Sequence, residues 1–318
     1  MNIYLVYGAF ILIVLLLLAL DLGVFNKKLH VIGIREALGW SAFWICLGLL
    51  FSLAVYYIYE HHWLDIGDLK ADNISGQKAL FEYLTGYIIE KSLSLDNIFV
   101  IALIFEYFKI PLIYQHRVLF WGIVGALLLR GIMISAGAIM ISQFTWTVYV
   151  FGLFLIFTAI KMLISGDEKI DPDKNPIYKI VKKFYKITDK IDGMHFFAKV
   201  DGKKAVTPLF IALIIVESSD VLFAVDSIPA IFAVTKEPFI VFTSNIFAIL
   251  GLRSLYFALA AMIQKFRYLK ISLVFILSYV GVKMVLSHHY PIPSWVSLIF
   301  IAVILAVGII ASMIRSKK

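Results

Sequence analysis

The sequence predicts an all-α membrane protein with about nine transmembrane helices, and three observations lead to this fold class. Hydrophobic residues make up 62% of the 318 residues and charged residues only 16%, with a mean hydropathy of +0.93. Apolar segments of about 20 residues, the length that crosses a hydrocarbon core of about 30 Å, recur along the chain. Part of the chain is also repeated. Soluble domains do not have this composition.

The apolar segments define the predicted helices in chain order. Their approximate limits are 2–22, 38–59, 79–108, 114–142, 146–164, 206–233, 239–263, 268–287 and 294–314. The first segment is expected to remain as a helix, because no basic residue precedes it and no small-residue cleavage site follows it, as both would in a signal peptide.

The net charge of +8 is better explained by membrane topology than by nucleic-acid binding. Lysine and arginine gather in alternate connections: ten lie in 165–205, whereas 143–145 and 288–293 contain none. Because basic residues mark the cytoplasmic side of a membrane, the odd-numbered connections are expected to be cytoplasmic. This places the N-terminus outside and the C-terminus in the cytoplasm, which requires an odd number of spans.

The long connection 165–205 is expected to have structure of its own. Its first part carries apolar residues on one predicted helical face and lysines elsewhere, a pattern typical of a helix on an anionic membrane surface. That face consists of Ile177, Ile180, Val181, Phe184, Ile187 and Ile191. A calmodulin-like partner is the alternative explanation. Further on, Asp201-Gly202 separates two short alternating runs, which predicts a β-hairpin.

An internal repeat organises the whole sequence. The segment "SLDNIFVIA" aligns with "SSDVLFAVD", and the register holds over about seventy residues. Three pairs of charged residues keep nearly the same spacing: Asp96 and Asp220 (124 positions), Arg130 and Arg253 (123), and Lys161 and Lys283 (122). Each copy holds three spans, so the second copy must enter the membrane from the opposite side. Transporters built from such inverted repeats bind their substrates near the middle of the membrane, between the copies.

Five segments follow from these patterns. Two helices precede the first copy, a cytoplasmic loop separates the two copies, and one helix follows the second. The limits are 1–78 for the N-terminal pair, 79–164 for the first copy, 165–205 for the loop with its amphipathic helix and hairpin, 206–287 for the second copy and 288–318 for the last helix.

Carboxylates within the predicted spans are the main functional signal. They are Glu90, Asp96, Glu217, Asp220 and Asp226. Each one costs about 2.5 to 3.5 kcal/mol at the centre of a spanning helix on insertion scales. Structural ion pairing would compensate some of them. The intramembrane bases available for this charge compensation are Lys91, Arg130 and Arg253.

A bound cation accounts for the excess of acids over bases. Carboxylate and carbonyl oxygens suit hard divalent ions such as Mn²⁺, Ca²⁺ or Mg²⁺. Asn97 can add an amide oxygen, and Asp21, at the inner end of the first span, is a further candidate ligand or exit residue. Asn245 is expected to form a hydrogen bond between helices. The single cysteine, Cys46, excludes an intrachain disulfide and a thiolate cluster, and no prosthetic group is expected.

Helical geometry limits how these acids can meet. Asp226 lies six residues beyond Asp220, about 240° round a regular helix, so a straight helix cannot direct both carboxylates at one ion. Pro229 lacks an amide hydrogen and its ring clashes with the preceding turn, which predicts a kink. Glu90 and Asp96 have the same six-residue spacing. We therefore expect the third and sixth spans to be discontinuous.

Two long blocks of the chain resemble the signature regions of a known family. "GYIIEKSLSLDNIFV" and "VESSDVLFAVDSIPAIFAVTKEPFIVFTSNIFAILGLRSLYF" are similar to those of the TerC family, in its long, nine-span Alx-like branch of bacterial inner-membrane proteins. The resemblance implies Mn²⁺ export and manganese homeostasis, with an association with tellurium resistance and alkaline conditions. It also implies that the five intramembrane acids form the metal site. The choice of Mn²⁺ over Ca²⁺ depends on the resemblance and not on the residues alone.

The number of carboxylates suggests proton coupling. Five negative charges exceed what one divalent ion cancels, so some of the acids are expected to hold protons when metal is absent. We expect Mn²⁺/H⁺ antiport, with Asp96 and Asp220 as the core of the site and Glu217 and Asp226 as candidate proton carriers. Homo-oligomers or membrane-protein partners remain open, beside the lipid bilayer and the metal ion.

Two other functional classes were compared with transport. An intramembrane aspartyl protease uses a Gly-x-Gly-Asp element, and the only Gly-Asp pairs here, Gly67-Asp68 and Gly166-Asp167, lie in predicted loops. An enzyme is therefore not expected. The resemblance also allows a factor for membrane-protein assembly, insertion or stress complexes without transport activity. Stoichiometric Mn²⁺ binding would separate that alternative from a transporter.

Overall fold

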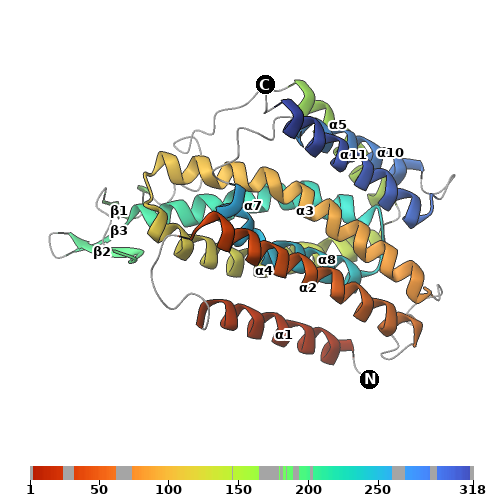
Figure 1. Cartoon of the computed structure of the whole chain (residues 1–318), viewed down its shortest axis with the longest axis horizontal. Helices are drawn as coiled ribbons and strands as arrows, with labels where there is room; N and C mark the ends of the chain where they lie inside the picture. The colour runs from red at the N-terminus through yellow and green to blue at the C-terminus, as the bar shows by residue number, and fades with distance from the viewer. Residues whose placement is uncertain are drawn as a thin grey trace.

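The computed structural model is a bundle of long helices with a small sheet at one end (Figure 1). It describes residues 3–23, 32–61, 74–144, 146–164, 179, 182–183, 185–188, 193–200, 203–259, 269–286 and 292–315. The helices are α1 (Ile3–Gly23), α2 (Ile34–Glu60), α3 (Gly76–Tyr107), α4 (Leu112–Gln143), α5 (Thr147–Ile164), α7 (Pro208–Phe232), α8 (Pro238–Leu250), α9 (Leu252–Leu259), α10 (Leu269–Leu286) and α11 (Ser294–Arg315). The architecture is therefore almost entirely α-helical.

Five of the described helices are long and apolar enough to cross a membrane. They are α2, α4, α5, α7 and α11. The pair α8 and α9 makes a sixth span if it is counted as one bent segment, and α1 and α10 contain shorter apolar stretches. Helix α3 is long enough, at 32 residues, but it carries several charged side chains. The helices coincide with the apolar segments of the sequence, and the total of nine spans stays a prediction.

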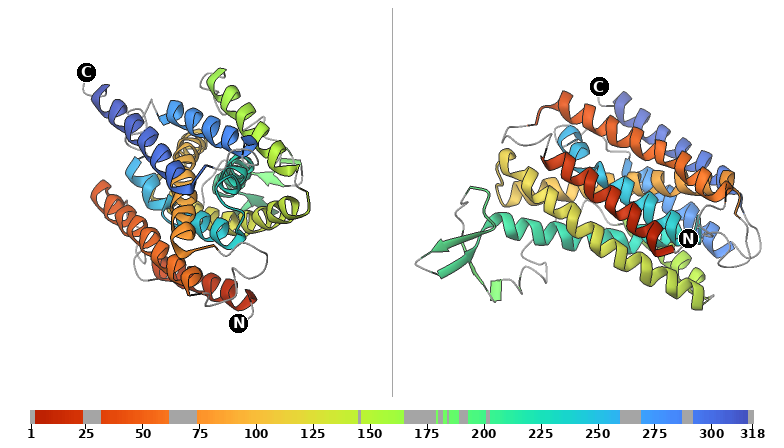
Figure 2. Two further views of the ribbon diagram at one scale, coloured as in Figure 1. Left: turned by 90° about the vertical axis from the view of Figure 1, so that its right-hand side faces the viewer. Right: turned by 90° about the horizontal axis from the view of Figure 1, so that it is seen from below.

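Three short strands form the sheet that projects beyond the helices (Figure 2, right). They are β1 (Lys186–Ile187), β2 (Phe197–Val200) and β3 (Lys203–Val206), in the order β1-β3-β2. Strands β2 and β3 pair antiparallel where the sequence predicts a hairpin, with Asp201-Gly202 outside the described residues. Ile187 belongs to β1, parallel to β3, so the predicted amphipathic helix cannot continue through it. The other members of that apolar face lie outside the described residues.

Helices α7 and α8 lie near the middle of the bundle, and α1 lies at its edge (Figure 2, left). Almost every residue of α8 is buried, as is the C-terminal turn of α7 from Ser227 to Phe232. Helix α7 begins after Thr207, with Pro208 at a first-turn position where the missing amide hydrogen costs nothing. The sequence near Glu217 and Asp220 is thus placed in the interior of the protein.

The predicted breaks in the third and sixth spans are wrong. Helix α3 runs unbroken from Gly76 to Tyr107, and α7 continues through Pro229 to Phe232. A proline removes one helical hydrogen bond, and close packing of the buried C-terminal end holds the helix together despite that loss. The break lies instead at Gly251, between α8 and α9, where the chain bends by 41°.

Helix pairing in the interior has a regular pattern. Helix α3 packs against α7, and α5 packs against α10. Helix α4 packs against α7 as α8 packs against α3. Gly152 and Gly281 allow α5 and α10 to approach closely. A Cβ on either residue would lie only 2.9–3.0 Å from the carbonyl oxygen of the other, too close for an ordinary contact. A two-fold relation between the copies would produce these pairings, and the inverted repeat itself stays a prediction.

Aromatic rings attach α1 to the outer side of α8. Phe10 contacts Phe239, Phe242 and Phe247, with ring centroids 5.6–6.2 Å apart, and the ring of Phe51 of α2 lies tilted against that of Phe247, with centroids 4.5 Å apart. Much of the outer face of helix α4, in contrast, is not packed against any other described element. Its large exposed side chains include Trp121, Leu128, Ile132 and Ile139.

Candidate functional site

Arg130 of α4 is the centre of a buried polar cluster. Its side chain is 1% exposed. Its Nε donates to Asp220 Oδ2 at 3.0 Å and its Nη2 to Asp220 Oδ1 at 2.7 Å, while its Nη1 donates to Glu90 Oε1 and, at 3.1 Å, to Asn245 Oδ1. The guanidinium thus engages two carboxylates at once. Three helices, α3, α4 and α7, are joined at this point.

Two asparagines complete the partners of these carboxylates. Asn245 of α8 donates to Glu90 Oε2 at 3.0 Å, and Asn97 of α3 donates to Asp220 Oδ1 at 3.1 Å. Glu90 and Asn97 are seven residues apart, so two helical turns place them on the same face of α3. Asn245 thus makes the contact between helices that the sequence predicts. Buried charges need such partners, since a lone buried charge costs several kcal/mol.

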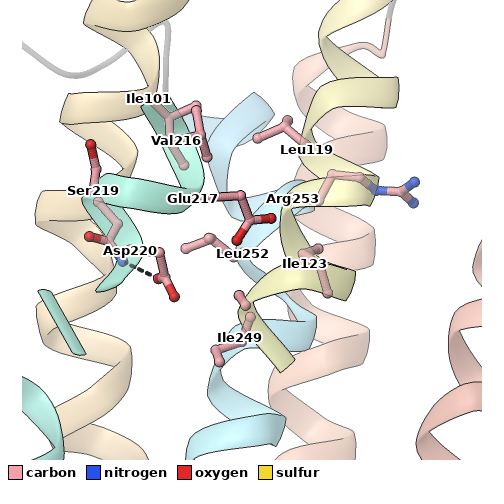
Figure 3. Close-up of a pocket in the computed structure, with 13 residues that line it drawn as sticks. Ile101, Leu119, Ile123, Val216, Glu217, Ser219, Asp220, Ile249, Leu252 and Arg253 are labelled. Carbon is pink, nitrogen blue, oxygen red and sulfur yellow. Dashed lines mark hydrogen bonds between the residues drawn. The ribbon is translucent and has the colours of Figure 1, made fainter. Parts of the chain in front are cut away.

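A small cavity lies beside the cluster, between α3, α4, α7 and the α8–α9 segment (Figure 3). Its volume of about 20 Å³ is enough for one water molecule or one ion. Glu217 and Asp220 share one face of α7 because they are three residues apart, and both carboxylates point into the space between the helices (Figure 3). Most of the remaining lining is aliphatic, so these oxygens are its main polar feature.

Two oxygen atoms in this region lack a hydrogen-bond partner. Glu217 Oε2 and Asn97 Oδ1 are buried and have no partner among the described residues. The amide group of Asn97 uses its nitrogen on Asp220, which leaves its oxygen for another ligand. Gly125 of α4 makes room for Glu217, since a Cβ there would lie 2.5 Å from Glu217 Cδ and 2.6 Å from Oε2. Buried acceptors without partners indicate a bound water or ion.

Asp226 and Lys91 do not line this cavity. Asp226 Oδ1 accepts a hydrogen bond from Thr158 of α5 at 3.1 Å, and its carboxylate interacts electrostatically with Lys161. Lys91 Nζ donates to the carbonyl of Ala248 at 3.0 Å. The side chains of Asp21 and Asp96 lie outside the described part of the structure.

Arg253 lines the cavity but its guanidinium points away from Glu217 and Asp220 (Figure 3). Its Nη1 lies 2.8 Å from His116 Nε2. Three bases were predicted to compensate the acids. Among them, Arg130 forms direct ion pairs with two carboxylates, those of Glu90 and Asp220. The described hydrogen bonds of Arg253 and Lys91 lead to an imidazole and to a backbone carbonyl.

The described side chains include no group of three or more histidines, cysteines, aspartates and glutamates arranged to hold a metal ion. Helical geometry separates the acids of α7, because a continuous helix directs Asp226 away from the face that carries Glu217 and Asp220. A cation in the cavity would therefore contact these two carboxylates, the oxygen of Asn97 and water. The metal-binding role of the five predicted acids stays a prediction.

Sequence reasoning missed several residues that position the predicted side chains. Gly125 is essential to the position of Glu217, and its signal was the small residues that recur in α4, since glycine in a spanning helix permits close approach. His116 and Thr158 were also missed. Their partners, Arg253 and Asp226, are distant in sequence, so only the fold reveals these contacts.

Comparison with known proteins supports the family relationship. Residues 75–318 match the model of the integral membrane protein TerC family. An uncharacterised membrane protein of Myxococcus xanthus, STKORF319, is 48% identical over 311 residues, covering 98% of this chain and 92% of the relative. Alx of Escherichia coli (strain K12), whose name describes a proposed membrane-bound redox modulator, is 44% identical over 295 residues, covering 92% and 89%.

No solved structure matches the chain. The family model covers the cluster around Arg130 and the cavity beside it, and both relatives extend over more than nine tenths of this chain. The chain therefore belongs to the TerC family of integral membrane proteins.

Proposed function

We propose that this protein is a bacterial inner-membrane transporter that exports Mn²⁺ through the cavity between α3, α4 and α7. The observation that carries the proposal is a pair of buried oxygens, Glu217 Oε2 and Asn97 Oδ1, that have no hydrogen-bond partner among the described residues and lie beside the carboxylate of Asp220. Oxygen donors of this kind bind hard divalent cations. The metal is cargo, held briefly by side chains that bind it weakly enough to release it.

Charge supports a divalent ion. The carboxylates of Glu90 and Asp220 pair directly with the guanidinium of Arg130, whereas the carboxylate of Glu217 lies in the adjoining cavity. Three carboxylates and one guanidinium leave two negative charges, and one divalent cation would cancel them. Arg130 fixes the orientation of Asp220 through two hydrogen bonds, so that its carboxylate is in place when the ion arrives. Mn²⁺ is chosen among hard divalent ions because the family resemblance implies manganese export.

Glu217 is the candidate proton carrier of the proposed Mn²⁺/H⁺ exchange. It is half-buried, one of its oxygens has no partner among the described residues, and it interacts electrostatically with another carboxylate, that of Asp220. Such a group is neutralised either by a proton or by a cation. In this scheme Mn²⁺ enters from the cytoplasm as Glu217 releases its proton. A proton from outside returns to Glu217 when the metal leaves.

Metal binding is tested with purified full-length protein in detergent, titrated with Mn²⁺ by calorimetry. The wild type is expected to bind with a defined stoichiometry, and Glu217→Gln to bind at least about 10-fold more weakly, because a charged ligand is lost. Glu106→Gln is the matched control, since Glu106 is an exposed carboxylate on the same protein at the end of α3. Equal affinities in all three proteins would refute the site.

Transport is tested in proteoliposomes with Mn²⁺ on one side and an imposed pH gradient. The wild type should move Mn²⁺ and carry protons in the opposite direction, and Glu217→Gln should lose the dependence on the gradient. Movement of Mn²⁺ that ignores the gradient would leave a channel or uniporter as the better description. A protein that neither binds nor moves Mn²⁺ would favour an assembly or stress-complex factor.

The redox role that the name of the Escherichia coli relative proposes has little support in this chain. The sequence contains one cysteine, Cys46, which is exposed on α2. One thiol cannot form a disulfide within a single chain, so a dithiol cycle would need a second molecule. We therefore propose transport, without enzymatic activity, as the primary function.

A further inference from the structure

The bend between α8 and α9 is the one sharp break within a described span. Helix α8 ends at Leu250, α9 begins at Leu252, and the two axes differ by 41° at Gly251. The carbonyl groups in the last turn of a helix have no partners within it and carry the negative end of the helix dipole. A break in the middle of the bundle therefore creates acceptors that must be satisfied by another group.

Lys91 of α3 supplies that group. Its Nζ donates to the carbonyl oxygen of Ala248, in the last turn of α8, at 3.0 Å. A lysine ammonium at a helix C-terminus is favourable for both the hydrogen bond and the dipole. The interaction is made across the bundle, between residues 157 positions apart in sequence.

Glycine at position 251 allows the lysine to reach this place. A Cβ on residue 251 would lie 2.8 Å from Lys91 Nζ and 3.0 Å from Cβ of Trp44 on α2. Both distances are shorter than ordinary van der Waals contacts. The lysine, the glycine and the tryptophan therefore pack as one unit around the break.

The break is connected to the proposed ion site on both sides. Ile249, Leu252 and Arg253 flank Gly251 and line the cavity. Lys91 directly follows Glu90, the carboxylate that pairs with Arg130. A change of charge at the carboxylate cluster would thus reach the break through adjacent residues of α3, and a change at the break would reshape the cavity wall.

We propose that Lys91 is a positioning residue for transport, which holds the α8–α9 break against Gly251 and thereby sets the cavity wall of Ile249, Leu252 and Arg253. The expected effect on transport rests on the proposed function. The expected stabilisation of the bend rests only on the hydrogen bond from Lys91 to Ala248. Lys91 contacts no bound ion in this scheme. It keeps the α8–α9 segment bent, so that Ile249, Leu252 and Arg253 stay at the cavity wall.

The structural consequence is tested by hydrogen–deuterium exchange of full-length protein, followed by mass spectrometry of peptides that span residues 245–256. Lys91→Met should increase exchange there by about 5- to 30-fold, the factor that loss of one good local interaction produces. Gly251→Ala keeps the charge but displaces the ammonium, so it should have a similar effect. Lys283→Met is the matched control, because Lys283 is a buried lysine of α10 whose Nζ donates to Ser297 of α11 at 2.9 Å.

A double variant identifies the shared contact. If Lys91 and Gly251 act through one interaction, then the two changes together should increase exchange no more than either alone, because interacting sites are not additive. Exchange at 245–256 that is unchanged in Lys91→Met, or that rises equally in the Lys283→Met control, would overturn the proposal. A lysine that only supports general stability would give that second result.

The transport consequence is read from two quantities in the same variants. Lys91→Met should keep Mn²⁺ binding in calorimetry within about threefold of wild type, and lose at least about 10-fold in Mn²⁺ flux into proteoliposomes. Equal losses in binding and flux would overturn the positioning role. If the wild type itself moves no Mn²⁺, the proposed function fails, and the exchange measurements alone decide whether Lys91 holds the break.

Discussion

Replacing Gly125 by alanine tests the position of Glu217 without changing any charge. The added methyl group would lie 2.5 Å from Glu217 Cδ and 2.6 Å from Oε2. Carbon atoms in contact are normally about 3.5 Å or more apart, so the carboxylate must move by about 1 Å. It can do so only by leaving its rotamer or by shifting α7 away from α4.

The size of the effect follows from this displacement. Inserting a methyl group into a well-packed interior costs about 1 to 3 kcal/mol. If this strain raises the free energy of the metal-bound state by the same amount, the affinity for Mn²⁺ falls by roughly 5- to 150-fold, since about 1.4 kcal/mol corresponds to a factor of ten. The loss should resemble that of Glu217→Gln, although Gly125 itself cannot ligate a metal.

The assay is Mn²⁺ calorimetry on purified protein, with Gly131→Ala as the control. Gly131 also lies on α4 but does not line the cavity, and a Cβ there would lie 3.5 Å from Cε2 of Phe242, an ordinary contact. Equal affinities for Gly125→Ala and Gly131→Ala would refute the reasoning. So would a Gly125→Ala protein with normal affinity and normal melting temperature.

Two further predictions concern the stability of the bundle. Arg130→Gln should lower the free energy of unfolding by about 3 to 5 kcal/mol, because both carboxylate partners would be left as uncompensated buried charges; a thermal melt in detergent equal to that of the wild type would contradict it. Gly281→Leu should separate α10 from α5 at Gly152 and lower the melting temperature, whereas Gly39→Leu, with nothing within 4 Å, should leave it unchanged; equal melting of the two variants would show that the close approach is not needed.

The sequence was sufficient to place the helices, because apolar segments and membrane spans share one physical cause, the cost of exposing polar backbone to lipid. It also identified Glu217, Asp220 and Asn97 as candidate ligands, and the structure gathers oxygens of all three around one cavity. Carboxylates are costly in a membrane, so their positions are informative even without a fold.

The same reasoning failed where an outcome depends on packing. Pro229 predicted a break in α7, yet the buried end of the helix tolerates it, and the bend lies at Gly251. A helix breaks where another side chain satisfies its freed carbonyls, and Lys91 does this from 157 residues away. No local pattern contains that partner. Asp226 was grouped with the site for the same reason, since sequence spacing alone cannot show that Thr158 accommodates it.

The aromatic rings that cover α8 have a consequence for which part of the protein can move. Displacing α8 would separate Phe10 and Phe51 from its rings, and those contacts would have to be rebuilt at each step. Helix α4 exposes Leu128 and Ile132 at 68% and 67%, so along this face it exchanges one fluid hydrocarbon neighbour for another at almost no cost. We therefore expect the exposed face of α4 to move more easily than α8, and lipid viscosity to slow that movement. The rate of transport would then depend on the fluidity of the lipid next to α4. Bilayers with stiffer acyl chains should lower the transport rate without altering the affinity of the protein for the ion.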